Sequence, residues 1–174
     1  MKIVQATKRD WQLIAGVADR SWRIGYAGVL SDVQIDFMLN RSYTERGIAE
    51  AMDGGQIFYL GNDGEKTVGF AAVQRQGADV LRLEKLYLSP EEQGKGYGGN
   101  FILFAERLAL QLGFSLLELN VNRNNKAYHF YLRQGFEIWK TVDIPYFGFV
   151  LNDYVMRKRV TGTTAQPTHS SLNK

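Results

Sequence analysis

The sequence predicts a single mixed α/β domain in which helices flank an open sheet. Apolar residues recur at helical spacing in some segments and form short alternating or continuous runs in others. The order of these segments is strand, two helices, three strands, helix, strand, helix and two strands. With 174 residues, of which 45% are hydrophobic, the chain is long enough to bury one core and too short for two ordinary domains.

The first quarter of the chain predicts one short strand followed by helices. Residues 3–6 read as the opening strand, and residues 7–10 fit a capping box with an acid in place of the usual glutamate. The helix that follows is expected to run to about Arg23, where glycines break it. Ser31 is placed to cap a second helix. A third helical piece is expected over residues 44–52.

The next segment changes to the period of a strand. Residues 57–60 and 67–73 are apolar and β-branched or aromatic, and residues 61–64 between them are rich in glycine, asparagine and aspartate. This pattern predicts an antiparallel hairpin. A second turn at residues 77–79 leads into a further strand over residues 80–88.

The last third predicts one more helix between strands. Residues 115–121 form a buried strand, and Asn124 is expected to cap a short helix. Residues 136–142 and 147–157 then pair as a final hairpin across Pro145. Together these elements predict a sheet of about seven strands with about four flanking helices.

Residues 1–160 are expected to form the domain, and residues 161–174 are polar enough to predict a disordered tail. The chain has no cysteine and two histidines, which excludes disulfides and thiolate chemistry and argues against a metal site. No signal peptide and no apolar run of about 18 residues is visible, so a cytoplasmic protein without a membrane partner is expected. The predicted edge strands make a homodimer plausible.

A glycine-dense turn, residues 93–99, lies between the strand 80–88 and a long helix over residues 100–112. Glycine adopts left-handed backbone angles, and the first amides of a helix have no carbonyl partner. Such a turn suits a phosphate. A net charge of +3 is too mild to indicate nucleic acid and fits an anionic cofactor equally well.

Three patterns compete for this turn. The G-x-G-x-x-G of dinucleotide folds fits the glycines, but it belongs near the first strand of a βαβ unit, and the turn lies past the middle of the chain. A Walker loop needs serine or threonine after Gly-Lys, whereas Gly96 follows Lys95. The third pattern, Gln/Arg-x-x-Gly-x-Gly/Ala, is filled by Gln93, Gly96 and Gly98.

The third pattern resembles the pyrophosphate-binding turn of the GCN5-related N-acetyltransferases. A second motif, N-x-x-A-x-x-F-Y-x-x-x-G-F from Asn124 to Phe136, carries the same resemblance, which covers residues 1–160. It implies a mostly antiparallel mixed sheet with a central splay and an acetyl-CoA-dependent enzyme that acetylates a primary amine.

The resemblance also implies where acetyl-CoA lies. Its pantetheine is expected in the splay, bonded to the strand backbone at Leu86 and Leu88 as an added strand would be, with the pyrophosphate on the amides of residues 93–98. The residues expected to contact the cofactor are Leu86, Tyr87, Leu88, Gln93, Gly94, Lys95, Gly96, Tyr97, Gly98, Gly99, Asn122, Asn124, Lys126 and Tyr131. Asn122 and Asn124 are alternatively helix-capping residues.

Two residues are candidates for the chemistry. The resemblance implies that Tyr131 protonates the departing thiolate of coenzyme A, and the alternative is a core tyrosine. Many relatives carry a glutamate eleven positions before the glutamine, where this chain has Arg82. Glu84 lies two residues further on the same strand face. It is either the general base or the partner of Arg82, and a neutral amine could also be drawn from solution.

The acceptor is the open part of the interpretation. Aromatic residues expected to line its cleft are Trp22, Tyr26, Tyr87, Tyr146 and Phe147, with ordinary core packing as the alternative. Residues 22–39 and 148–156 are similar to a bacterial branch that includes spermidine/spermine acetyltransferases. A polyamine acceptor is therefore expected, with a protein lysine or N-terminal amine as the rival. A non-catalytic acyl-CoA sensor is the alternative from another class.

Overall fold

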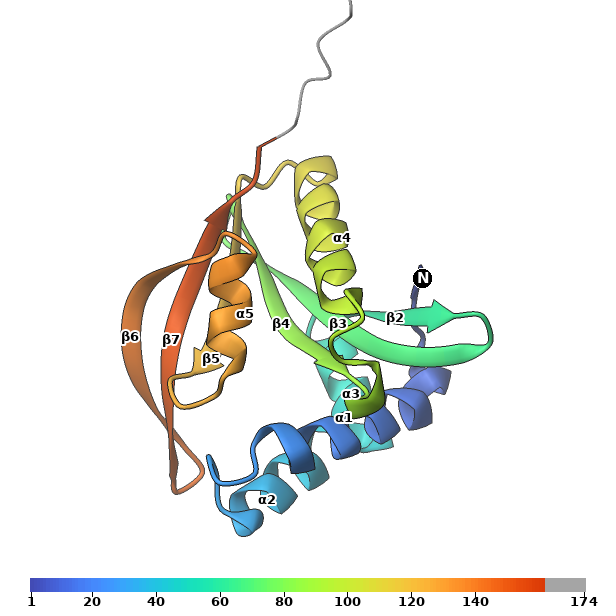
Figure 1. The fold of residues 1–174 in the computed structure, drawn as a ribbon, viewed down its shortest axis with the longest axis vertical. Helices are drawn as coiled ribbons and strands as arrows, with labels where there is room; N and C mark the ends of the chain where they lie inside the picture. Colours follow the sequence, from blue (N-terminus) through green and yellow to red (C-terminus); the bar gives the residue numbers. More distant parts are fainter. Residues whose placement is uncertain (162–174) are drawn as a thin grey trace, which may run out of the picture.

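The computed structural model describes residues 1–161 and contains one seven-stranded sheet in the order β1-β2-β3-β4-β5-β7-β6 (Figure 1). Neighbouring strands are antiparallel except for β4 and β5, which are parallel. The strands are β1 (Lys2–Gln5), β2 (Ile57–Asp63), β3 (Lys66–Gln76), β4 (Val80–Leu88), β5 (Leu116–Asn122), β6 (Glu137–Tyr146) and β7 (Phe149–Arg159). The predicted mixed, mostly antiparallel sheet is confirmed.

Five α-helices accompany the sheet in the described residues: α1 (Trp11–Gly25), α2 (Asp32–Ser42), α3 (Glu45–Asp53), α4 (Tyr97–Gln111) and α5 (Ala127–Arg133). Short 3-10 turns, η1 (Lys8–Asp10) and η2 (Pro90–Glu92), precede α1 and the glycine turn. About four helices were expected. α3 is the helical piece expected over residues 44–52, and Thr44 caps it because its Oγ1 accepts the amide of Gly47 at 3.1 Å.

The two predicted caps at the start of the chain are confirmed. Asp10 Oδ2 accepts the backbone amide of Thr7 at 2.7 Å, and Thr7 Oγ1 accepts the amide of Arg9. Ser31 Oγ accepts the amide of Gln34 at 3.2 Å and begins α2. The first cap begins η1, which leads directly into α1, and the second fixes where α2 begins.

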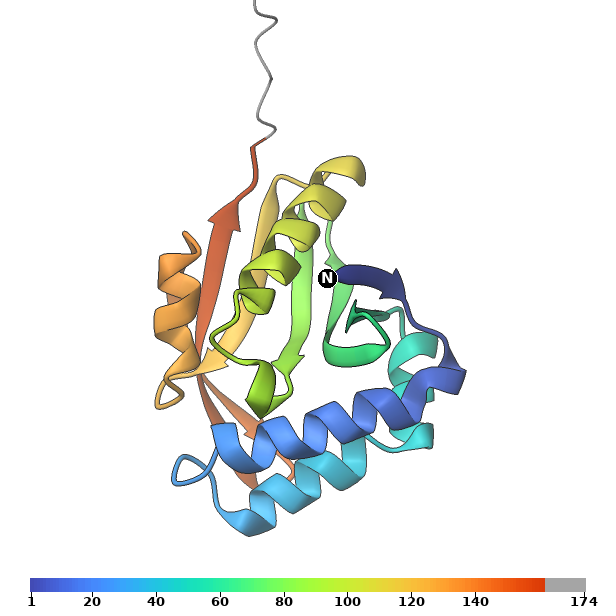
Figure 2. The same cartoon turned by 45° about the vertical axis from the view of Figure 1, so that its right-hand side comes forward.

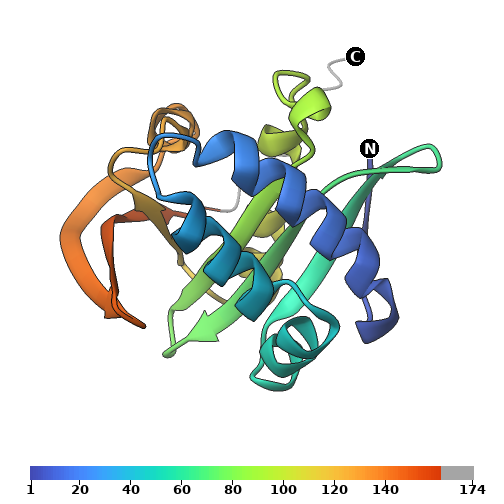
Figure 3. The ribbon, with the colours of Figure 1, turned by 90° about the horizontal axis from the view of Figure 1, so that it is seen from below.

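The sheet has a core on each face. Helices α4 and α5 lie on one face (Figures 1 and 2), and α1 and α2 cross the other (Figure 3). Buried side chains at the centre of the first core are Phe101, Ile102, Leu117, Leu119, Phe136 and Met156; those of the second are Ile14, Val17, Ile48, Phe58 and Phe70. Strand residues alternate between the two cores, as the period of a strand requires.

Strands β4 and β5 are paired over only three positions, Val80 to Arg82 opposite Leu116 to Glu118. Both strands continue beyond this point without further pairing to each other, and β4 runs on toward α1 (Figure 2). The central splay expected for the sheet is therefore present. It leaves the later backbone of β4 without a strand neighbour on the β5 side.

The final hairpin differs from the expectation in its turn. Pro145 lies inside β6 opposite Val150, and the two-residue turn is formed by Phe147 and Gly148. Their φ angles of 49° and 83° are both left-handed, as a type I′ hairpin turn requires. The proline is tolerated because β6 is an edge strand and one side of its backbone needs no partner.

The predicted disordered tail falls almost wholly on residues 162–174, outside the described part of the chain. Within residues 1–161, no helix is long and apolar enough to cross a membrane. The same residues contain no group of three or more histidine, cysteine, aspartate or glutamate side chains placed to share a metal ion.

Candidate active site

A cavity of about 580 Å³ occupies the gap between β4 and β5. Its walls come from both strands beyond their last paired position, from the end of α1, from the glycine turn and from α5. The lining residues are Ser21, 24–27, Val29, 83–88, Gln93, Gly98, 119–121, 124–127, Phe130 and Tyr131. The cavity thus lies where β4 and β5 separate.

The backbone of β4 offers hydrogen-bonding groups to this cavity. The amide of Ser89 donates to the carbonyl of Val68 at 2.9 Å, which makes that pair a hydrogen-bonded one in the β3–β4 ladder. Hydrogen-bonded and non-bonded pairs alternate along antiparallel strands. The backbone groups of Leu86 and Leu88 therefore face the gap, which fits an extended amide-containing chain such as pantetheine.

The glycine turn closes one end of the same cavity. Gly94 and Gly96 have φ angles of 77° and 84°, and Gly96 is the N-cap of α4. Of the predicted contact residues in the turn, Gln93 and Gly98 line the cavity, whereas Gly94, Lys95, Gly96, Tyr97 and Gly99 lie outside its lining. An added Cβ at Gly98 would lie 3.0 Å from the ring of Phe130, so this glycine lets α5 pack closely on the turn. The free amides of α4 suit a phosphate at this end.

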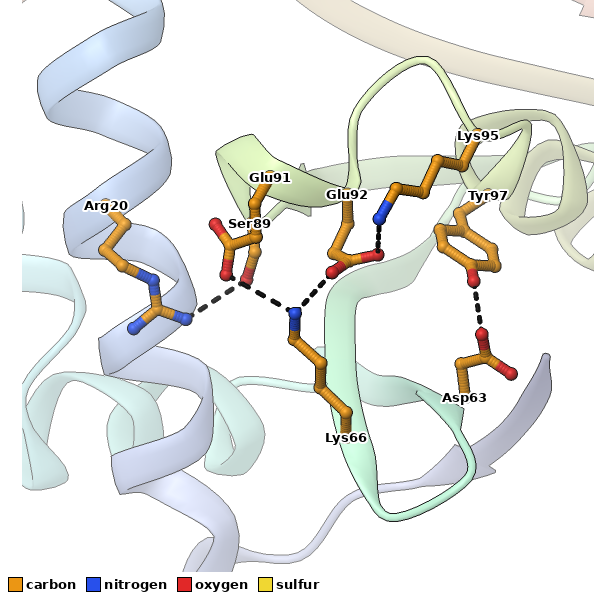
Figure 4. A network of polar contacts seen from close by, with 8 residues as sticks. All are labelled: Arg20, Asp63, Lys66, Ser89, Glu91, Glu92, Lys95 and Tyr97. Atoms are coloured by element: carbon orange, nitrogen blue, oxygen red, sulfur yellow. Dashed lines mark hydrogen bonds and ion pairs between the residues drawn. The ribbon is translucent and has the colours of Figure 1, made fainter.

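Side chains around the turn hold it in place (Figure 4). Glu92, which is 5% exposed, accepts a bond from Lys95 at 2.9 Å and one from Lys66 of β3. The two lysines keep the pKa of Glu92 below its ordinary value, Lys66 more than Lys95. The hydroxyl of Tyr97 donates to Asp63 at the end of β2. The turn is therefore tied to the β2–β3 hairpin.

Tyr131 lines the cavity from α5 and is 9% exposed. Its ring also packs against Phe130 and Phe136, with centroids 5.1 and 5.7 Å away. Tyr131 therefore packs in the core and lines the cavity at the same time, so the two alternatives for this residue do not exclude each other. Burial, followed by the nearby hydroxyl of Tyr26, raises the pKa of Tyr131 above its ordinary value of 10. The phenol therefore keeps its proton at neutral pH, as a general acid must.

The start of α5 corrects one prediction. Asn124 does not cap the helix: the N-cap position is Lys126, whose side chain makes no capping bond, and Asn125 Oδ1 in the preceding loop accepts the amide of Ala127 at 2.9 Å. The helix begins at Ala127, so the N-cap position falls two residues later than expected. Asn122 Oδ1 accepts the amide of Asn124 at 2.9 Å and shapes the loop. Asn124 and Lys126 line the cavity, and Asn122 does not.

Glu84 lies at a β-bulge. Lys85 is opposite Ala72 and Leu83 is opposite Val73, which leaves Glu84 without a partner on β3. Glu84 lines the cavity, and Oε1 of its carboxylate is 3.0 Å from Nε of Arg82. The expected meeting of these two side chains is confirmed. Glu84 stays on the same strand face as Arg82, and the bulge changes the alternation only from Lys85 onward.

The predicted acceptor residues fall into three places. Tyr26 and Tyr87 line the cavity, and burial raises the pKa of both hydroxyls. Trp22 is 6% exposed and lies behind them, with its ring centroid 4.4 Å from that of Tyr26. Tyr146 and Phe147 sit at the tip of the β6–β7 hairpin against Phe37 of α2, outside the cavity lining.

Several cavity residues were not singled out from the sequence. Asn120 of β5 lines the cavity, and Lys85 does so with Nζ 2.9 Å from Oε1 of Gln56. Asp153 of β7, an acidic residue that the sequence offers as a partner for a polyamine, lies outside the cavity lining, is 9% exposed and accepts the amide group of Asn120 at 3.2 Å. The signal for Asn120 was the alternation along β5, which puts Glu118, Asn120 and Asn122 on one face of a strand otherwise apolar.

The chain was compared with known proteins. The model of the acetyltransferase (GNAT) family matches residues 29–136. A spermidine N(1)-acetyltransferase from Thermoplasma acidophilum is 27% identical over 165 residues, covering 91% of this chain and 97% of that protein.

Solved structures agree with this match. The PaiA N-acetyltransferase of T. acidophilum, in complex with coenzyme A, has a TM-score of 0.76 at 25% identity, covering 91% of this chain and 98% of that one. A GCN5-related N-acetyltransferase from Rhodopseudomonas palustris has a TM-score of 0.78 at 22% identity, covering 91% and 94%, and it shows the shared fold alone.

The family match spans well over half of the chain and includes both strands of the gap, the glycine turn and Tyr131. The backbone of Leu86 and Leu88 and the amides of α4 fit the pantetheine and pyrophosphate of acetyl-CoA, the cosubstrate of the family. The protein belongs to the GNAT acetyltransferase family and is an acetyl-CoA-dependent N-acetyltransferase.

Proposed function

We propose that the acceptor is a polyamine such as spermidine. The observation that carries this proposal is the presence of two carboxylates near the gap, those of Glu84 and Asp153. Glu84 lines the cavity, and Asp153 lies next to the cavity-lining Asn120. Among residues 1–161, Asp153 forms no ion pair within 4 Å, and Arg82 and Arg123 act on it only from a longer distance, so an ammonium group could pair with it directly. The spermidine acetyltransferase of T. acidophilum supports the same acceptor class.

The hairpin tip supports a slender acceptor over a polypeptide. Phe37 of α2 packs against Phe147 and Phe149, with ring centroids 5.7 and 5.5 Å away, and joins the β6–β7 hairpin to α2 (Figure 1). An extended peptide needs an open groove across this end of the sheet. A polyamine chain is narrow enough to enter beside such a bridge.

Acetyl-CoA supplies a thioester whose carbonyl carbon a neutral amine attacks. We assign Glu84 as the base that removes the proton from the acceptor ammonium, directly or through water. The amide of Leu88, which faces the gap, is the donor for the charge on the carbonyl oxygen. Tyr131 donates its proton to the sulfur. A phenol of raised pKa is a weaker acid than a thiol, so donation accompanies cleavage of the C–S bond and does not precede it.

The test is a thiol-release assay with acetyl-CoA and a panel of amines. Because the chain has no cysteine, a thiol reagent detects only released coenzyme A. Spermidine and spermine are expected to give kcat/KM values at least about tenfold above those of lysine or N-terminal-amine peptides. Faster turnover of a peptide would overturn the polyamine assignment. If no amine of the panel causes release of coenzyme A, while acetyl-CoA still raises the melting temperature, the protein would be a binding domain and not an enzyme.

A further inference from the structure

Arg82 and Glu118 face each other at the last paired position of β4 and β5. Nη1 of Arg82 is 2.6 Å from Oε1 of Glu118. The next residues on the two strands, Leu83 and Leu119, already line the cavity. This ion pair therefore lies at the apex of the gap.

The guanidinium of Arg82 makes three contacts at once. Nε is 3.0 Å from Oε1 of Glu84, and Nη1 bonds to Glu118. Nη2 donates to Oδ1 of Asn120 at 2.8 Å. A planar guanidinium holds its donors in a fixed fork, so the contacts to β5 determine where Nε points. The position of the Glu84 carboxylate is thereby set from the opposite strand.

Glu118 does not depend on Arg82 alone. It is 2% exposed, and a buried carboxylate needs a partner. Nε of Arg157 on β7 lies 2.7 Å from its other oxygen. Two carboxylates, Glu84 and Glu118, thus face two guanidiniums. Arg157 bonds one oxygen of Glu118 and Nη1 of Arg82 bonds the other, which leaves Nε of Arg82 for Glu84.

We propose that Arg82 is a positioning residue for the reaction: it holds the carboxylate of Glu84 at the bulge, aimed into the cavity, from a fixed point at the apex of the gap. This inference rests on the proposed role of Glu84 as the base. It assigns to Arg82 no contact with either substrate.

The experiment measures kcat for the best amine of the panel and the Kd of coenzyme A. Arg82→Met is expected to lower kcat by about tenfold or more, within the range of general-base effects, and to change the Kd by less than about threefold. Arg82→Lys keeps the charge but loses the fork, so an intermediate kcat is expected. If Arg82→Met fails to fold, Arg82→Lys decides, and wild-type kcat in that variant would overturn the proposal.

Two comparisons separate positioning from a structural role. In a Glu84→Gln background, Arg82→Met should lower kcat by less than about twofold further, since residues acting through one another are not additive. The matched control is Arg157→Met, which removes the other guanidinium from Glu118 and does not touch Glu84. It is expected to keep kcat within about twofold of wild type.

An equal loss in Arg157→Met and Arg82→Met, or an undiminished loss in the Glu84→Gln background, would overturn the positioning role. Wild-type kcat in Glu84→Gln would overturn the base and this inference together. Neither result bears on the acceptor, because the panel of amines decides the polyamine assignment with the wild-type enzyme alone.

Discussion

Nζ of Lys95, in the glycine turn, lies 2.9 Å from Oε2 of Glu92, and the same buried carboxylate accepts a bond from Lys66 of β3 (Figure 4). One carboxylate thus joins the turn before α4 to a hairpin on the other side of β4. Nearby, Nη2 of Arg20 on α1 donates to the hydroxyl of the buried Ser89 at 3.1 Å. The turn is fixed before any phosphate arrives, which lowers the ordering cost of binding.

Replacing Glu92 should lower stability in a pH-dependent way. The folded protein depresses the pKa of Glu92, chiefly through Lys66, so its stabilisation is present above the ordinary value of 4.5 and is lost as pH falls through the folded value. Glu92→Gln is expected to melt below wild type at pH 7, and the gap should close as the pH is lowered below about 4.5. Melting curves across pH measure this directly.

Glu91→Gln is the matched control. Glu91 is the neighbouring carboxylate, its side chain is half exposed, and its closest oxygen is 3.8 Å from Nζ of Lys66. A pair of that length in solvent contributes little. Glu91→Gln should therefore leave the melting temperature nearly unchanged at every pH. Equal effects of the two substitutions would show that burial of Glu92 has no special role.

Gly96→Ala tests the turn as the phosphate site. Gly96 has a φ of 84° and nothing within 4 Å of an added Cβ, so the cost of alanine is backbone strain of about 1–2 kcal/mol. Relief of that strain moves the amides at the start of α4. The Kd of coenzyme A, measured by calorimetry, is expected to rise by about fivefold or more, equivalent to about 1 kcal/mol.

Gly64→Ala introduces the same strain elsewhere. Gly64 has a φ of 60° in the β2–β3 turn and is equally free of neighbours. Both variants should lose similar stability, and only Gly96→Ala should lose affinity for coenzyme A. Wild-type affinity in Gly96→Ala would remove the turn from the binding site.

Tyr131→Phe tests the general acid. The variant keeps the ring contacts with Phe130 and Phe136, so the Kd of coenzyme A should change by less than about threefold. Loss of the proton donor should lower kcat by about a hundredfold. Because burial raises the pKa of Tyr131 above 10, wild-type kcat should show no decline from its ionisation below about pH 10.

The control for Tyr131→Phe is Tyr59→Phe. Tyr59 is as little exposed, packs on Phe104 in the same core, and has a pKa raised by burial, but it lies outside the cavity lining. The kcat of the Tyr59→Phe variant should match that of wild type. Unchanged turnover in Tyr131→Phe would leave Tyr131 as a core residue only.

The sequence predicted best what depends on neighbours in the chain. The caps at Thr7 and Ser31 follow from local backbone needs and were found where expected, whereas α4 begins at Tyr97, inside the turn expected over residues 93–99. Asn124 does not cap α5, whose N-cap position is Lys126, because a shift of the helix start by two residues is invisible to motif spacing. A helix boundary read from the sequence carries that uncertainty.

Features set by distant strands could not be predicted. The bulge at Glu84 arises from pairing with β3, and the ion pair of Arg82 with Glu118 depends on where β4 and β5 separate. The turn at Phe147 reads as strand because an aromatic residue disfavours a left-handed φ. Its contact with Phe37, and its cation–π contact with Arg41 at 3.9 Å, accompany that conformation only in the fold.

Asp153→Asn tests the polyamine assignment at a single residue. Burial raises the pKa of Asp153, and the bond from Asn120 opposes that shift only in part. An ammonium group of spermidine would meet this carboxylate, whereas a simple alkyl monoamine has no second charge to place there. Asp153→Asn is expected to raise the KM for spermidine about tenfold, as loss of a charged hydrogen bond implies, and to leave kcat/KM for butylamine within about twofold.

Asp143→Asn supplies the matched control, because Asp143 lies on β6, its side chain is 61% exposed, and it already pairs with Arg123 at 2.6 Å. Its removal should leave the KM values of both amines unchanged. In wild type, the KM for spermidine should also fall as pH rises through the raised pKa of Asp153, since only the ionised carboxylate attracts an ammonium. If Asp153→Asn lowers kcat/KM equally for spermidine and butylamine, the prediction is contradicted. Asp153 would then be a structural partner of Asn120 with no part in selecting the acceptor.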